Sequence, residues 1–252
     1  MRFDTHIHTN FSPCSNMRPE DVVRRAFEMR LSEIVIKDHD QIEGAIRAKN
    51  FAVEHYRELF KVNLGIEITT EFGEIGASFL TEEQCLRLME SRNERGKFDF
   101  GKIVEISREF FSDPNSSALF DLHHPYDFAN PKRGFNFQGP VDEGIFSSTE
   151  GLLKFFDYTE INTASTSIRE TWAALQLASE TGLPLVCSTD SHFLSQIGRY
   201  YTESDKPDAH EAIVDNADLR HSIKSLEEIN YFRSRMYRIA SWLLKRKRKL
   251  VG

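Results

Sequence analysis

Short apolar runs in this chain end repeatedly in histidine and carboxylate residues. The first run leads into His6-Ile7-His8, the second into Asp38-His39-Asp40, and one near the far end of the chain into Asp190-Ser191-His192. Such runs are typical of the inner strands of an α/β barrel, whose C-terminal ends all meet on one face. The pattern therefore favours a fold in which many strand ends surround one site.

Length and composition agree with that fold. The chain has 252 residues and is 40% hydrophobic, which suits one large α/β domain with a sizeable core. No run of about 18 apolar residues occurs, so we expect no transmembrane helix. The three cysteines are an odd and sparse set, and the first residues lack the apolar stretch of a signal peptide. We therefore expect a cytoplasmic protein without a disulfide framework.

Apolar runs alternate with amphipathic stretches along the whole chain, which predicts βα units within a single domain over residues 1–252. We predict seven strands: Phe3–His8, Glu33–Lys37, Val62–Ile68, Glu74–Leu80, Ala118–Leu122, Asp157–Ile161 and Leu185–Ser188. We predict helices that begin at Arg18-Pro19 and Thr81-Glu82, and helices over Glu43–Phe60 and Ile168–Thr181. Seven strands with helical crossovers indicate a TIM-like barrel short of eight units.

The polar strand ends are the candidate functional residues. His6 and His8 lie two apart, so in a strand they share one face, although this pair alone could equally be two surface histidines. Three further strand ends carry Glu67, His123-His124 and Glu160. Six such ends in one chain favour a joint metal site.

The ligand types indicate the metal chemistry. Histidine and carboxylate without a thiolate pair suit Zn²⁺, Mn²⁺ or Fe²⁺ in an open catalytic site. There are more than four candidate ligands, so we expect two or three ions. Ions about 3.5–4 Å apart can share a bridging hydroxide that attacks a phosphate ester.

Six stretches resemble the motifs of the polymerase-and-histidinol-phosphatase (PHP) domain family of metal-dependent phosphoesterases. They are Asp4–Thr9, Asp38–Asp40, Gly65–Glu67, His124–Asp127, Glu160–Asn162 and Ser188–His192, which follow the family's order and span nearly the whole chain. The resemblance implies a distorted TIM-like (β/α)7 barrel that holds a di- or trinuclear centre. It implies metal ligands at His6, His8, His39, Glu67, His124, Asp190 and His192.

Two positions depart from the family pattern. Where the family usually has Asp or His after the first histidine pair, this chain has Cys14, which is either a thiolate ligand or a small buried thiol. We include Cys14 among the candidate metal ligands. Where the family often has a histidine in the strand after the glutamate ligand, this chain has Glu74. Glu74 replaces that ligand, or the third metal is absent and Glu74 is a plain surface residue.

Basic loop residues are candidates for substrate binding. Arg133 and Arg199 resemble family positions that face the substrate, and an arginine fork matches phosphate oxygens, although a solvated loop cation is the alternative for each. His192, or another histidine of the site, is the expected proton donor to the leaving oxygen. His123 neighbours His124, and strand alternation predicts that it points the other way and is structural.

The C-terminal segment is basic, in contrast to the net charge of −7 for the whole chain. Phe232, Met236, Ile239 and Leu243 fall on one face of a helix at about residues 222–250, which we expect to pack on the barrel. Lys245–Lys249 then form either a solvated end or a nucleic-acid contact. A membrane-surface helix and a partner-docking helix are further alternatives.

Three functional hypotheses follow. The first is a metal-dependent phosphoesterase that acts on a phosphorylated small molecule or nucleotide, with Arg133 and Arg199 holding the phosphate. The second is a nuclease that acts on 5′ ends of RNA or DNA and uses the basic tail. The third is a weakly active, metal-bound module that docks on a larger assembly. The sequence gives no oligomeric state.

Overall fold

The computed structural model describes residues 1–94, 96–127, 133–162, 168–216, 218–222, 236 and 239–246. Within these residues one mixed sheet runs in the order β7-β6-β5-β4-β3-β2-β1-β8-β9. Its strands are β1 (Arg2–Ile7), β2 (Glu33–His39), β3 (Lys61–Thr70), β4 (Gly73–Leu80), β5 (Leu119–Leu122), β6 (Tyr158–Asn162), β7 (Leu185–Ser188), β8 (Thr202–Glu203) and β9 (Arg220–His221). All seven predicted strands are present.

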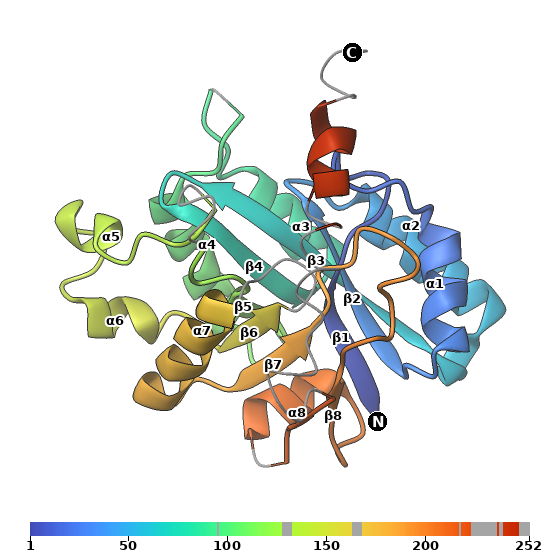
Figure 1. Cartoon of the computed structure of the whole chain (residues 1–252). Coiled ribbons are helices and arrows are strands. Elements are labelled where there is room, and N and C mark those ends of the chain that lie inside the picture. Colours follow the sequence, from blue (N-terminus) through green and yellow to red (C-terminus); the bar gives the residue numbers. More distant parts are fainter. Residues whose placement is uncertain are drawn as a thin grey trace.

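The sheet curls until its first strand meets the segment that follows β7. Ile7 pairs in parallel with Ser191, and the amide of His8 donates to the carbonyl of Ser191 at 3.0 Å. The strands thereby form a nearly closed barrel with helices outside it (Figure 1). The predicted fold class, a distorted TIM-like barrel, is confirmed.

The sequence predicts helical crossovers between the strands, but no helix lies between β3 and β4. β3 and β4 are antiparallel neighbours joined by Glu71 and Phe72 alone, and β4 is also antiparallel to β5. Gly73, at the start of β4, has φ 126°, a backbone conformation that other residues rarely adopt and that allows the tight connection. The barrel is distorted at this hairpin.

Eight α-helices lie among residues 1–222 of the described part, a further helical segment covers residues 239–246, and the predicted helix starts are correct. The eight helices are α1 (Pro19–Glu28), α2 (Glu43–His55), α3 (Glu82–Met89), α4 (Phe100–Ser112), α5 (Gly139–Asp142), α6 (Thr149–Leu153), α7 (Ile168–Thr181) and α8 (Ala209–Asp215). α1 begins with its proline in the first turn, and Thr81 and Gln84 form a capping box at α3. α2 is shorter than predicted, because a separate 3₁₀ turn covers Arg57–Leu59.

The barrel interior is layered along the strands. At the end where the strands begin, an apolar cluster joins Phe3, Val35, Leu119 and Val186 to residues of α8. In Figure 1, α8 lies below this end of the barrel. Side chains two apart on a strand share a face, so on β2 the inward positions after Val35 are Lys37 and His39. An apolar floor is thus followed by a charged layer and then by the histidines.

The C-terminal helix differs from the prediction. Residues 239–246 are helical, but Met236, Ile239 and Leu243 are 52%, 46% and 54% exposed. The expected packing of this stripe on the barrel is therefore wrong for these three residues, because a helical spacing defines a face without defining what covers it. Phe232 and Lys247–Lys249 lie outside the described residues.

In the part of the chain that the structure describes, every helix is too short or too polar to cross a membrane.

Candidate metal centre

β1 directs two fully buried histidines toward one carboxylate. His8 Nε2 lies 2.8 Å from Asp190 Oδ1, and His6 Nε2 lies 3.6 Å from the same oxygen. Asp190 follows β7 and has φ 49°, in the left-handed region that Asp tolerates better than most residues. The barrel closure described above therefore brings the first and last ligand clusters of the sequence together.

Glu67, at the end of β3, is the centre of the arrangement. Its Oε2 lies 3.2 Å from His8 Nε2 and 3.0 Å from His39 Nδ1. Its Oε1 lies 3.1 Å from His123 Nε2 and 3.0 Å from His124 Nε2. Its two oxygens face two different pairs of histidines, so Glu67 belongs to two of the groups of possible metal ligands.

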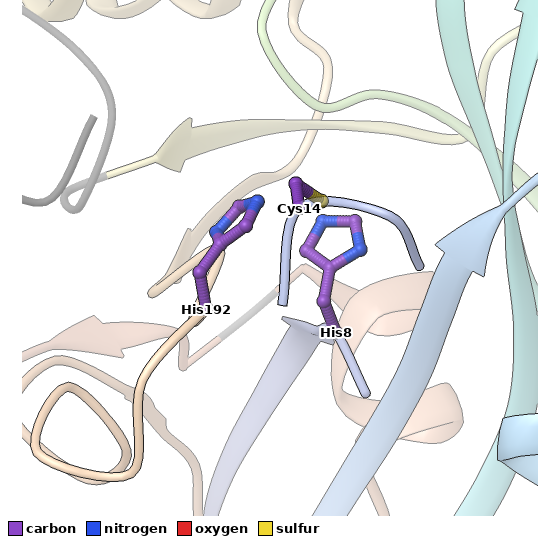
Figure 2. Close-up of side chains that lie close together, drawn as sticks. All are labelled: His8, Cys14 and His192. Carbon is purple, nitrogen blue, oxygen red and sulfur yellow. The ribbon is translucent and has the colours of Figure 1, made fainter. Parts of the chain in front are cut away.

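Cys14 reaches the same site from the loop after β1. Its sulfur and one ring nitrogen each of His8 and His192 lie within 4.8 Å of one another. Figure 2 shows the three side chains close together. Burial raises the pKa of the Cys14 thiol to about 11. Since only the thiolate binds metal, loading this position would release the proton.

Asp38 fixes the loop that carries Cys14. Its carboxylate accepts hydrogen bonds from the amide and hydroxyl of Thr9, at 2.7 and 2.5 Å, and from the hydroxyl of Ser12 at 2.6 Å. The Ser12 hydroxyl also lies 3.0 Å from His8 Nδ1. Asp38 therefore orients a candidate ligand without being one itself.

The charges of the buried groups suit a cation. Burial opposes the ionised form of Glu67 and of Asp190, but the neighbouring histidines hold the pKa of both carboxyls well below their usual range. Burial lowers the pKa of His192 to about 4, and it also lowers the pKa of His39 well below its usual value. Ionised carboxylates beside neutral imidazoles are the protonation state that metal ions bind.

The carboxylates around His6 favour its protonated form. Burial opposes its charge, yet Glu160 and Asp190 together raise its pKa to about 9. A divalent cation would compete with this proton for the same negative charge, so metal binding is expected to be pH-dependent.

Three buried polar atoms support a fit to metal. Among the described residues, none forms a hydrogen bond with Asp190 Oδ2 or His124 Nδ1, and the ring nitrogens of His8 and His39 that lie near Glu67 Oε2 are poorly aligned for one. An unpaired buried carboxylate oxygen is costly, and a coordinated cation would satisfy it. The nitrogen and oxygen donors, with one sulfur, fit divalent ions such as Zn²⁺, Mn²⁺ or Fe²⁺.

Arg133 and Glu74 lie beside this centre. The Arg133 Nε donates to Glu74 Oε2 at 2.7 Å, and its Nη2 lies 2.9 Å from His124 Nε2. Glu74 is 6% exposed, so the interpretation of it as a plain surface residue is wrong. Its partner, 59 positions further along the chain, could not be recognised from sequence.

The prediction for Arg199 stays open, and the prediction for His123 is wrong. The Nε of Arg199 donates to the backbone carbonyl of Ser195, and its role in phosphate binding stays a prediction. His123 is fully buried and joins Glu67 and His124 in one group of possible ligands, so the expectation that it points away is wrong. β5 ends at Leu122, and the strict alternation on which that expectation rested ends with it.

We expect the Cys14→Ala variant to bind about one ion fewer per chain, since its thiolate would complete the position shared with His8 and His192. Metal content after dialysis, measured by plasma mass spectrometry, checks this. The matched control is Cys85→Ala, which removes a thiol buried in the outer core on α3. Equal metal content in the two variants would contradict the ligand assignment.

Comparison with known proteins agrees with this geometry. A family model described as PHP domain matches residues 4–100, and one described as PHP-associated matches residues 169–226. Over 215 residues, 76% of this chain, the sequence is 24% identical to DNA polymerase III subunit alpha of Buchnera aphidicola. The match spans only 17% of the length of that subunit.

Two solved structures share the fold. PsfC from Pseudomonas syringae has a TM-score of 0.63 at 13% identity over 98% of each chain. An amidohydrolase from Chromobacterium violaceum has a TM-score of 0.50 at 15% identity, over 82% of this chain and 93% of that chain. At these identities the similarity establishes the fold alone.

Proposed function

The chain carries the PHP domain and the PHP-associated region of that family, and on this premise we propose that it is a metal-dependent phosphoesterase. The substrate class is a phosphomonoester or a nucleotide-like phosphodiester. One observation carries the proposal: the strand-end ligands predicted from sequence converge on two buried, ionised carboxylates, Glu67 and Asp190.

The proposed roles follow from position. The residues that would hold two or three divalent ions are His6, His8, His39, His123, His124 and His192, together with Cys14, Glu67 and Asp190. When bound, such ions supply a hydroxide nucleophile at neutral pH and neutralise charge on the phosphoryl oxygens. The Arg133 guanidinium is partly exposed beside His124, so its free N–H groups can bind a phosphate oxygen. His192 either completes the ligand group with His8 and Cys14 or, if it binds no ion, donates a proton to the leaving oxygen.

A nuclease is the second candidate, and the position of Lys245 favours it. In Figure 1 the helical residues 239–246 stand above the end of the barrel at which β2 and β3 finish. Burial raises the pKa of Cys14 and lowers that of His39. The positive charge of Lys245 lowers both pKa values, which places Lys245 near these two residues. Arg246 lies 4.8 Å from the centre of the Trp242 ring. Cations and an aromatic ring near the opening suit an anionic polymer.

The first experiment is Mn²⁺-supported phosphate release from a mononucleotide and from a 5′-phosphorylated oligonucleotide, with the Asp190→Ala protein as blank. Release from the mononucleotide alone supports the small-molecule phosphatase, and shortening of the oligonucleotide supports the nuclease. If the wild type matches the blank on both, the phosphoesterase proposal fails for these substrates. The remaining hypothesis, a weakly active module within a larger assembly, would then gain weight.

We expect removal of Lys245–Gly252 to lower cleavage of an oligonucleotide by about tenfold at low salt and by less at high salt, because the tail would neutralise phosphates. Mononucleotide hydrolysis should stay unchanged. Initial rates at two ionic strengths measure both effects. A loss of equal size on both substrates would instead indicate that the tail supports the active site itself.

A further inference from the structure

A fully buried lysine lies between the apolar floor of the barrel and the candidate metal centre. Lys37 is on β2, two residues before His39. Its ammonium lies 2.7 Å from Asp121 Oδ1, 3.2 Å from Glu160 Oε1 and 3.2 Å from the hydroxyl of Tyr158. The three partners come from β5 and β6, on the other side of the barrel interior.

Each carboxylate that Lys37 holds reaches one histidine of the centre with its other oxygen. Glu160 Oε2 lies 3.1 Å from His6 Nδ1, and Asp121 Oδ2 lies 3.3 Å from His123 Nδ1. A carboxylate at Nδ1 places the proton there and leaves the Nε2 lone pair for a metal. The Nε2 atoms of both histidines are directed toward Glu67, at 3.7 Å for His6 and 3.1 Å for His123.

Other hydrogen bonds keep this layer in place. Glu160 also accepts from the hydroxyls of Thr5, at 2.7 Å, and Ser188, at 2.8 Å. Lys37 nevertheless supplies the positive charge that lies between the two carboxylates. Without it, two buried anions would face each other with only neutral donors and the histidines to offset them.

Two glycines make room for the arrangement. A Cβ at Gly65 would lie 3.0 Å from Lys37 Cγ and 2.6 Å from a methyl of Val35. A Cβ at Gly76 would lie 2.3 Å from Asp121 Oδ1. Side chains at these places on β3 and β4 would collide with the lysine stem and the aspartate. The absence of side chains at Gly65 and Gly76 therefore leaves the space that Lys37 and Asp121 occupy. This observation is independent of the hydrogen bonds.

We propose that Lys37 is a positioning residue of the metal centre, which holds Asp121 and Glu160 so that these carboxylates orient His6 and His123 toward the metal. The inference rests on the proposed metal-dependent function. It assigns a task to a charged side chain that never touches the ions. Residues that orient metal ligands in this way typically change metal affinity or activity by about 10–100-fold when they are replaced.

The test is the affinity of the purified full chain for Mn²⁺, followed by the visible spectrum of the Co²⁺-loaded protein. Lys37→Met keeps the length of the stem and removes the charge. We expect its Mn²⁺ dissociation constant to rise about 10–100-fold and its Co²⁺ absorption bands to shift. The matched control is Ile36→Ala, the preceding residue on β2, which packs into the outer core. It should lose stability but keep the wild-type affinity and spectrum.

A second pair of variants covers the case in which Lys37→Met does not fold. Asp121→Asn keeps the size of the side chain and should also weaken Mn²⁺ binding about tenfold or more. Ser107→Ala, which removes a buried 2.8 Å hydrogen bond to the backbone carbonyl of Val104 on α4, should not. Wild-type affinity and spectrum in a folded Lys37→Met or Asp121→Asn protein would overturn the inference. Failure of the wild type itself to bind Mn²⁺ would instead overturn the proposed function.

Discussion

Replacing His8 with alanine is expected to lower Mn²⁺-supported phosphate release by about a thousandfold or more. Among the described residues, His8 belongs to three of the four groups of possible metal ligands, which it shares with Cys14, Asp190 and Glu67. Its loss therefore removes a ligand from each of these three groups. Metal ions contribute several kcal/mol to such reactions, and each 1.36 kcal/mol is about tenfold in rate.

Initial rates at saturating substrate and Mn²⁺ measure this effect. The matched control is His55→Ala, which removes an exposed histidine that stacks on Phe51 at the end of α2. That variant should keep the wild-type rate. If His8→Ala retained more than about a tenth of the activity, a loss of less than 1.4 kcal/mol, His8 would not be a shared ligand.

The second large effect is on stability. We expect a chelator to lower the melting temperature of the metal-loaded protein by about 10 °C for each tightly bound ion. An ion present at about a thousand times its dissociation constant stabilises the folded state by about 4 kcal/mol. In a domain of this size, about 1 kcal/mol corresponds to about 2–4 °C. The buried carboxylates of Glu67 and Asp190 come together only in the folded protein, so removal of the ion destabilises the folded state.

Scanning calorimetry with and without chelator, followed by Mn²⁺ titration, measures this shift. The Asp190→Ala protein should show a smaller metal-dependent rise, because one of the two buried carboxylates is missing. A melting temperature that neither chelator nor added Mn²⁺ changes, in protein shown to contain no metal, would argue against a metal centre.

Much of this fold could be predicted from sequence, because buried strands have a local signature. The apolar runs before His8, Asp38 and Glu67 each proved to be a barrel strand. The candidate ligands lie at or just beyond the ends of those strands, so His39 and Asp190 both come close to His8, as expected. Periodicity and the properties of parallel strand ends are sufficient for these predictions.

The remaining features depend on contacts between distant segments. In the sequence, Lys37 is one polar residue at the end of an apolar run. Its contact with Asp121, 84 positions away, forms only when the barrel closes, so the sequence does not predict it. Arg133 reads as a loop cation, and only the turn after β5 places it on Glu74. The prediction that His123 points away from the site is wrong because β5 ends one residue before it, and side chains alternate strictly only within a strand. The β3–β4 hairpin depends on a two-residue connection that hydrophobic patterning does not resolve.

The closure of the barrel has a consequence for the unfolded chain. His8 and Asp190 are 182 positions apart, yet their side chains lie 2.8 Å from each other. An ion that binds both would act as a reversible cross-link around most of the protein. By analogy with a disulfide that closes a long loop, such a link corresponds to about 5 kcal/mol of chain entropy. Metal availability would then govern how long the first and last strands stay joined, and with them the lifetime of the folded protein.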